Sequence, residues 1–99
     1  MIALGTQMKT FVSVELPGGF TLDDVEYSIT YTSSQGGSYT LPREFMRTEE
    51  DGILCIVDTS KVGTGLYSVI LEVMIPDELA PEGRRKIVHK ERTNIRVNR

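Results

Sequence analysis

The sequence predicts an all-β protein: a single antiparallel β-sandwich of about seven short strands, spanning residues 1–99. Two observations carry this prediction. Apolar and polar residues alternate with a period of two along most of the chain, and no segment shows the 3.6-residue period of an amphipathic helix. Turn-forming residues interrupt this alternation about every 8 to 12 residues, as in sandwiches. The length of 99 residues suits one domain with one modest core.

The first half of the chain contains two clearly patterned strands. Residues 8–16 (MKTFVSVEL) put five side chains on one face: Met8, Thr10, Val12, Val14 and Leu16. Residues 25–32 alternate in the same way, with Val25, Tyr27, Ile29 and Tyr31 facing one side. Residues 39–48 (YTLPREFMRT) predict a weaker strand or a strand pair. Pro42 confines that piece to an edge or a bend, because proline cannot donate to a sheet ladder.

The second half contains the strongest strands. Residues 53–58 (ILCIVD) are apolar on both faces, which predicts a central strand. Residues 66–75 (LYSVILEVMI) alternate most regularly, and residues 85–97 form a last, less regular strand after the connector PDELAPEGR. No helix is expected. A closed five-stranded barrel remains an alternative to the sandwich.

A structural corner is predicted where Gly63, Gly65 and Tyr67 introduce the strongest strand. In Greek-key sandwiches, a tyrosine at such an entry often bonds its hydroxyl to upstream backbone. Glycines allow the close backbone approach that this bond needs. A phosphate-binding loop would instead require a helix after Gly65, and a strand pattern follows. The stretch is therefore interpreted as scaffold.

Charge is unevenly distributed along a chain of net charge −3. Residues 84–99 carry seven basic side chains and a single acidic one, Glu91. The basic run predicts a positive face that could bind a partner, and its candidate residues are Arg84, Arg85, Lys86, Lys90 and Arg92. The alternative is protection of an edge strand against stray pairing. Nucleic acid is disfavoured, because no stacking aromatic residues are interleaved with these charges.

Candidate catalytic groups are few, and no catalytic, cofactor-binding or metal-binding residue is expected. Cys55 lies in an apolar run and is interpreted as a buried, inert thiol, which suits a reducing compartment. His89 is the only histidine and is expected at a solvent-facing or interface position. The carboxylates Asp77, Glu78 and Glu82 lack the spacing of a calcium loop. A solvated loop is therefore the preferred interpretation there.

The N-terminal residues MIALGTQMK lack the features of a signal peptide, and no apolar run is long enough for a membrane helix. No membrane association is therefore expected.

Four segments, in this order, resemble small phage and prophage structural proteins of gut Bacteroidetes: LGTQMKTFVSVEL, LDDVEYSITY, EEDGILCIVDTSKVGTGLYSVILEV and IPDELAPEGRRKIVHKERTNIRV. Those proteins are similar to the immunoglobulin-like N-terminal module of phage baseplate upper proteins. The resemblance implies an immunoglobulin-like Greek-key sandwich that acts as a non-enzymatic assembly module of a tail or baseplate. It also implies protein partners in a homo- or hetero-oligomer, and location in the bacterial cytoplasm before assembly into a virion or tail-like particle.

Contacts are expected through the basic segment 86–97 and the loops 33–38 and 77–83. A different function, a carbohydrate- or surface-binding adhesin module, remains open. Its candidate glycan platform is Tyr31 and Tyr39, which bracket the loop at Gln35 to Gly37. A small enzyme would have to depend on His89 or Cys55.

Overall fold

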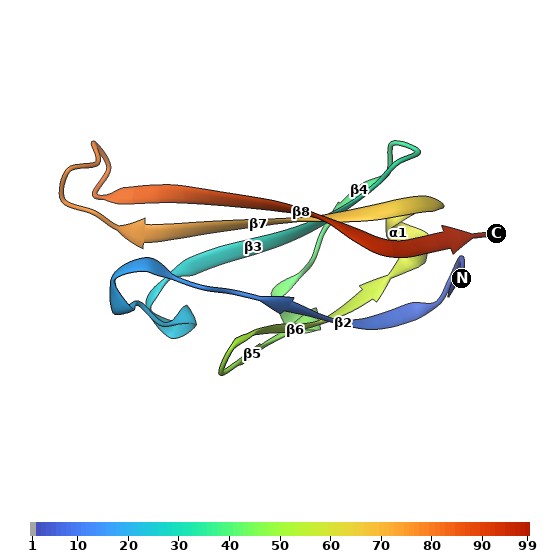
Figure 1. The fold of residues 1–99 in the computed structure, drawn as a ribbon, viewed down its shortest axis with the longest axis horizontal. Coiled ribbons are helices and arrows are strands. Elements are labelled where there is room, and N and C mark those ends of the chain that lie inside the picture. The colour runs from blue at the N-terminus through green and yellow to red at the C-terminus, as the bar shows by residue number, and fades with distance from the viewer. Residues whose placement is uncertain (1) are drawn as a thin grey trace.

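The computed structural model describes residues 2–99, so Met1 of the predicted domain lies outside the described part. The all-β prediction is confirmed, with eight strands rather than about seven (Figure 1). The strands are β1 (Ile2–Ala3), β2 (Gln7–Ser13), β3 (Glu26–Ser33), β4 (Ser38–Thr40), β5 (Met46–Glu49), β6 (Gly52–Asp58), β7 (Gly65–Pro76) and β8 (Arg84–Asn98). The last two are long, at 12 and 15 residues, which the interrupted pattern of residues 85–97 does not indicate.

The strands form two sheets. One has the order β1-β8-β7-β3-β4 and the other the order β2-β6-β5. Within residues 2–99 they stay separate, so the closed five-stranded barrel is wrong. All pairings are antiparallel except that of β1 with β8, which is parallel. The first sheet is therefore mixed, not purely antiparallel as expected.

The core lies between the two sheets, and the period-two alternation decides which residues enter it. In β7 every second side chain is buried: Tyr67, Val69, Leu71, Val73 and Ile75. β6 lies between β2 and β5, as its apolar composition predicts, and contributes Ile53, Cys55 and Val57. A hydrogen bond of 2.8 Å between the hydroxyls of Thr10 on β2 and Tyr31 on β3 links the two sheets through the core.

The segment from Tyr39 to Thr48 is a strand pair with a bend, one of the two arrangements predicted. β4 belongs to the larger sheet and β5 to the smaller one, and both are edge strands. Pro42 stands between them at the start of the 3-10 turn η3 (Arg43–Phe45). The chain thus changes sheets at the proline.

The expectation of no helix is wrong for short turns. Besides η3, residues 2–99 contain two further 3-10 turns, η1 (Pro17–Gly19) and η2 (Leu22–Asp24), and one α-helical turn, α1 (Thr59–Val62). The Asp58 carboxylate caps α1 by accepting a hydrogen bond of 3.0 Å from the Ser60 amide. Gly63, at φ 100°, ends it. A single turn is too short to produce a helical period in the sequence.

The molecule is elongated, with extents of 48 × 25 × 21 Å. Both ends of the chain lie at one end of the long axis, and the loop between β7 and β8 lies at the other (Figure 1).

Candidate functional site

The structure places the three residues of the predicted corner together. Tyr67 is fully buried, and its hydroxyl donates a hydrogen bond of 2.5 Å to the Gly63 carbonyl. The Thr59 carbonyl lies 3.3 Å from the same hydroxyl. Burial raises the pKa of the Tyr67 phenol. These contacts tie the start of β7 to α1, so the corner holds two elements of the scaffold together.

The second glycine of the corner permits a close approach between two loops. Gly65 has φ +120°, and a Cβ at this position would stand 2.7 Å from the Ser34 hydroxyl oxygen. That hydroxyl accepts a hydrogen bond of 2.9 Å from the Leu66 amide. The β3–β4 loop is held against the entry to β7 in this way.

The five basic residues predicted as an interaction surface all lie on β8, but they do not form one uniform patch. Arg84 forms an ion pair of 2.6 Å with Glu26, and Arg85 forms one of 3.0 Å with Asp77. Arg85 pairs with the buried Ile75 of β7 and so lies on the inner face. The other four alternate along the outer face: Arg84, Lys86, Lys90 and Arg92.

Beyond Arg84, the outer face of β8 carries three exposed cations and one apolar residue. The side chains of Lys86, Lys90 and Arg92 are exposed, and no ion pair involves them within residues 2–99. Val88 lies between Lys86 and Lys90 and is 56% exposed. We call Lys86, Val88, Lys90 and Arg92 the outer row.

The inner face of β8 is left largely uncovered. Ile87, His89 and Glu91 pair with Val73, Leu71 and Val69 of β7. Those β7 residues are buried, whereas His89 and Glu91 are exposed and Ile87 is half-buried. The smaller sheet therefore covers β7 but leaves His89 and Glu91 of β8 uncovered.

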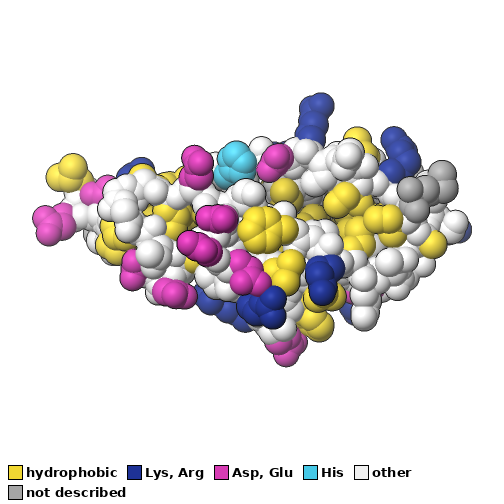
Figure 2. Space-filling view, turned by 60° about the horizontal axis from the view of Figure 1, so that its bottom comes forward, with side chains coloured by type: hydrophobic (Ala, Val, Ile, Leu, Met, Phe, Trp, Pro, Cys, Tyr) yellow, Lys and Arg dark blue, Asp and Glu magenta, His cyan; other side chains and the backbone are white. Residues whose placement is uncertain are grey.

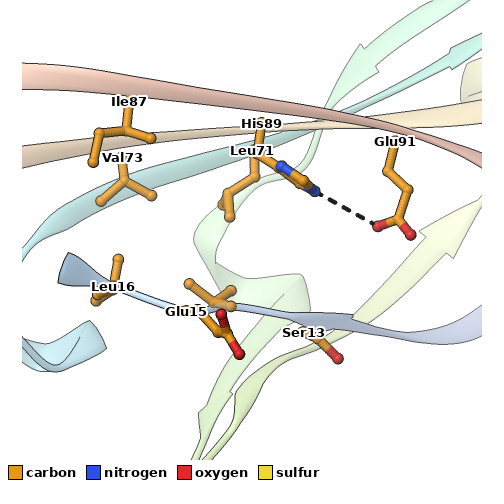
Figure 3. A pocket seen from close by; sticks show the side chains of 9 residues that line it. Ser13, Glu15, Leu16, Leu71, Val73, Ile87, His89 and Glu91 are labelled. Carbon is orange, nitrogen blue, oxygen red and sulfur yellow. Dashed lines mark ion pairs between the residues drawn. The ribbon is translucent and has the colours of Figure 1, made fainter.

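A groove lies between β2, with the segment that follows it, and the inner face of β8. We call this groove the seam. One part, of about 430 Å³, has five apolar lining residues, Val14, Leu16, Leu71, Val73 and Ile87. Ser13, Glu15, His89 and Glu91 form its polar rim, and the side chains from β7 and β8 face the segment after β2 across the opening (Figure 3). A second part, of about 620 Å³, continues between Thr10–Ser13 and Glu91–Ile95. The two parts share Ser13 and Glu91.

The wider surface around the smaller sheet carries further exposed apolar side chains. Figure 2 shows hydrophobic side chains along this face, with acidic side chains gathered towards the end that holds the β7–β8 loop. Phe11 on β2 is 49% exposed. A Cβ at Gly52 would lie 2.8 Å from the Phe11 ring, so this ring covers the glycine. Phe11 thereby has a local packing role.

Two further candidates, Cys55 and His89, lie where the sequence predicts them, and the glycan platform does not. Cys55 is fully buried, as predicted, and burial raises the pKa of its thiol to about 11. His89 is solvent-facing on the last strand, as predicted, with its Nε2 3.9 Å from Glu91 Oε2. The glycan platform is the exception. Tyr31 is only 2% exposed, and its hydroxyl is bonded to Thr10, so a platform of Tyr31 and Tyr39 is wrong.

The acidic loop is organised by its own hydrogen bonds. The Leu79 amide and the Arg85 side chain both bond the Asp77 carboxylate, and they hold the pKa of that carboxyl below its usual value. Within residues 2–99, no group of three or more His, Cys, Asp or Glu side chains is placed to hold a metal ion.

Sequence reasoning missed the seam, although one signal for it exists. Residues at the inward positions of a covered strand should be apolar, as all five are in β7. In β8 the inward positions include Arg85, His89 and Glu91. Polar residues at inward positions of an edge strand indicate that no second layer covers them.

Comparison with protein-family models, with curated proteins and with solved structures gave no significant match to this chain. Among the described residues, no helix is long and apolar enough to cross a membrane.

Proposed function

We propose that this chain is an immunoglobulin-like sandwich that serves as a non-enzymatic assembly module, a component of a phage or prophage tail or baseplate that acts through protein–protein contacts. The resemblance of its four ordered segments to such proteins motivates the role. The single observation that carries the docking function is the long exposed edge of β8, with its outer row and seam.

Strand order supports the immunoglobulin-like part of the proposal. Immunoglobulin-type sandwiches place strands C, F and G in one sheet and B, E and D in the other. Here β3, β7 and β8 are neighbours in one sheet, and β2, β6 and β5 form the other. A tyrosine near the start of strand F that bonds upstream backbone is a further mark of these domains. Tyr67 on β7 has this position and this bond.

The shape and charge of β8 support docking. An edge strand presents unpaired backbone groups to solvent, and natural proteins use such edges to bind partner strands. Three exposed cations in the outer row favour a partner with acidic side chains, because complementary charges speed association and select partners. The proposed site of action follows from the resemblance: the bacterial cytoplasm before assembly, and then the particle.

Molar mass in solution tests the proposed function. The chain would be mixed with the tail and baseplate proteins of the same phage or prophage, and the mass measured by light scattering over a concentration series. A defined trimer, hexamer or larger ring is expected, since closed symmetric multimers are the usual assemblies. A chain that stays monomeric at every concentration and enters no complex would contradict the assembly role.

A matched pair of variants locates the contact surface. Changing Lys90 and Arg92 to Glu should abolish complex formation while the chain stays folded. Changing Lys9 and Lys61 to Glu reverses two exposed charges away from β8 and should leave the complex intact. Equal behaviour of the two variants would show that the outer row is not the contact.

A further inference from the structure

Two sheet edges border the seam without strand partners. β2 is the outer strand of the smaller sheet and pairs only with β6 within residues 2–99. Within residues 2–99, β8 pairs with β1 only through Val97 and Asn98, so its edge from Arg84 to Ile95 has β7 on one side alone among the described strands. The stretch from Ile87 to Ile95, which pairs with β7 on one side and is open on the other, spans about 30 Å at the ordinary rise of a strand.

The walls of the seam suit the side chains of an added strand. Such a strand on the β8 edge would direct alternate side chains to the inner face, beside Ile87, His89 and Glu91 of β8 and over Leu16 and Val14. These walls belong to the same apolar cluster as the core, since Val14, Leu16 and Ile87 pack against it. Apolar side chains placed here would leave water, which is the main favourable contribution to such binding.

The other side chains of an added strand would meet the outer row. Directly opposed side chains on neighbouring strands lie about 4.5–5.5 Å apart, and opposite charges there are stabilising. Lys86, Lys90 and Arg92 are exposed on the outer face at this edge. Acidic residues at alternate positions would therefore complement this edge.

A second copy of this chain does not satisfy the same charges through β8 itself. In an antiparallel pair of β8 strands centred on His89, Lys86 of one copy would stand opposite Arg92 of the other. Every such register centred on a residue from 87 to 91 opposes at least one pair of cations. Like charges directly opposite one another destabilise a strand pair.

We infer that the seam accepts an extended segment of a partner protein, in which acidic residues alternate with apolar ones. The segment adds as a strand to the open edge of β8, with its acidic side chains beside the outer row and its apolar side chains in the seam. This inference deepens the proposed function, on which it rests, by naming the binding mode and the chemistry of the partner.

Synthetic peptides test the inference on the intact chain. The probe is an eight-residue peptide of alternating Glu and Val, capped at both ends, titrated into ¹⁵N-labelled protein. We expect saturable shifts in β8 and the segment 13–16, and slower hydrogen exchange for β8 amides between residues 86 and 96. The Lys90→Glu/Arg92→Glu variant should bind this peptide about tenfold more weakly and should prefer the Lys–Val analogue. The Lys9→Glu/Lys61→Glu control should bind like the wild type.

The other outcomes overturn either the inference or the proposed function on which it rests. Equal binding of a Glu–Ser peptide would mean that charge alone is recognised, without a strand in the seam. Protection at β4 or β5 instead of β8 would assign the strand to another edge. A dimer of the free chain with protected β8 amides would make a second copy the occupant. Ring assembly with tail proteins alongside failed peptide binding would refute only the strand-acceptor mode, whereas peptide binding without assembly would refute the tail role.

Discussion

Tyr67 shows how one side chain can stabilise the junction of several elements. Its ring is fully buried beside Tyr31, at a centroid distance of 6.4 Å, and its hydroxyl reaches the carbonyls of α1 and Gly63. The backbone of Tyr67 also accepts a hydrogen bond of 2.7 Å from the Thr93 hydroxyl on β8. The residue therefore joins α1, β7 and β8.

Replacing Tyr67 by phenylalanine isolates the contribution of its hydroxyl. We expect Tyr67→Phe to lower the free energy of unfolding by about 1–2 kcal/mol, because the part-buried Gly63 carbonyl loses the hydroxyl that bonds it. Urea unfolding followed by circular dichroism measures the change. Tyr27→Phe is the matched control, since it removes an exposed hydroxyl bonded to the Thr48 hydroxyl. Equal losses in the two variants would contradict a structural role for the corner bond.

Gly37 is required by close packing. A Cβ at this position would lie 1.7 Å from the Val62 carbonyl oxygen of α1. We expect Gly37→Ala to destabilise the fold by more than about 2 kcal/mol, because backbone must move to admit the methyl group. Thermal unfolding of this variant beside Ser38→Ala, its exposed neighbour, gives the comparison. A Gly37→Ala protein as stable as the Ser38→Ala protein would show that β4 and α1 separate easily.

At the scale of the element, α1 depends on its cap. The Ser60 hydroxyl and then the Ser60 amide bond the Asp58 carboxylate and lower its pKa. A carboxyl whose folded pKa is depressed contributes stability above its unfolded pKa, near 3.8, and loses it as the pH falls through the folded value. The Asp58 cap should therefore lose its contribution to stability only at acidic pH.

The Asp58→Ala variant tests this pH dependence. We expect it to be less stable than the wild type at pH 6, with a gap that narrows as the pH falls below about 4. Urea unfolding at pH values from 2.5 to 6 provides the measurement. Ser60→Ala removes only the hydroxyl donor and should show a smaller gap over the same pH range. A gap that is constant across the range would mean that the carboxylate charge contributes nothing to the cap.

The two longest strands, β7 and β8, differ in how well the alternation of apolar residues predicts which side chains are buried. The regular alternation of β7 correctly identifies five of its buried residues, because the smaller sheet covers one face of that strand along its length. β8 has polar residues at inward positions, since no second layer faces most of its length. Its irregular pattern reflects its place at the edge, which depends on the other strands.

At the scale of the whole molecule, the reactivity of Cys55 measures how often the core between the two sheets opens. Its thiol is fully buried between the sheets, and burial raises its pKa to about 11. Only the thiolate reacts readily with disulfide reagents, so the native protein should be inert at pH 8. We expect labelling to follow opening of the sandwich, and to slow or accelerate with stability in the variants above.

Labelling with an aromatic disulfide reagent in increasing urea measures this opening. The labelled fraction should rise together with the loss of β structure, and the unfolded chain should react at the rate of a free cysteine. Rapid reaction without urea would contradict a closed core at β6.

The sequence alone determined the all-β class, the faces of β2, β3 and β7, the central position of β6 and the burial of Cys55. These properties are local, because the period of a strand and the composition of its two faces are visible within a few residues. The tertiary structure decided which strands share a sheet and that β1 runs parallel to β8. It also created the seam and brought Arg84 to Glu26, 58 residues away in the chain. These features arise from pairing between distant segments, where the partner and register depend on how both sheets pack together, and no local pattern records that choice.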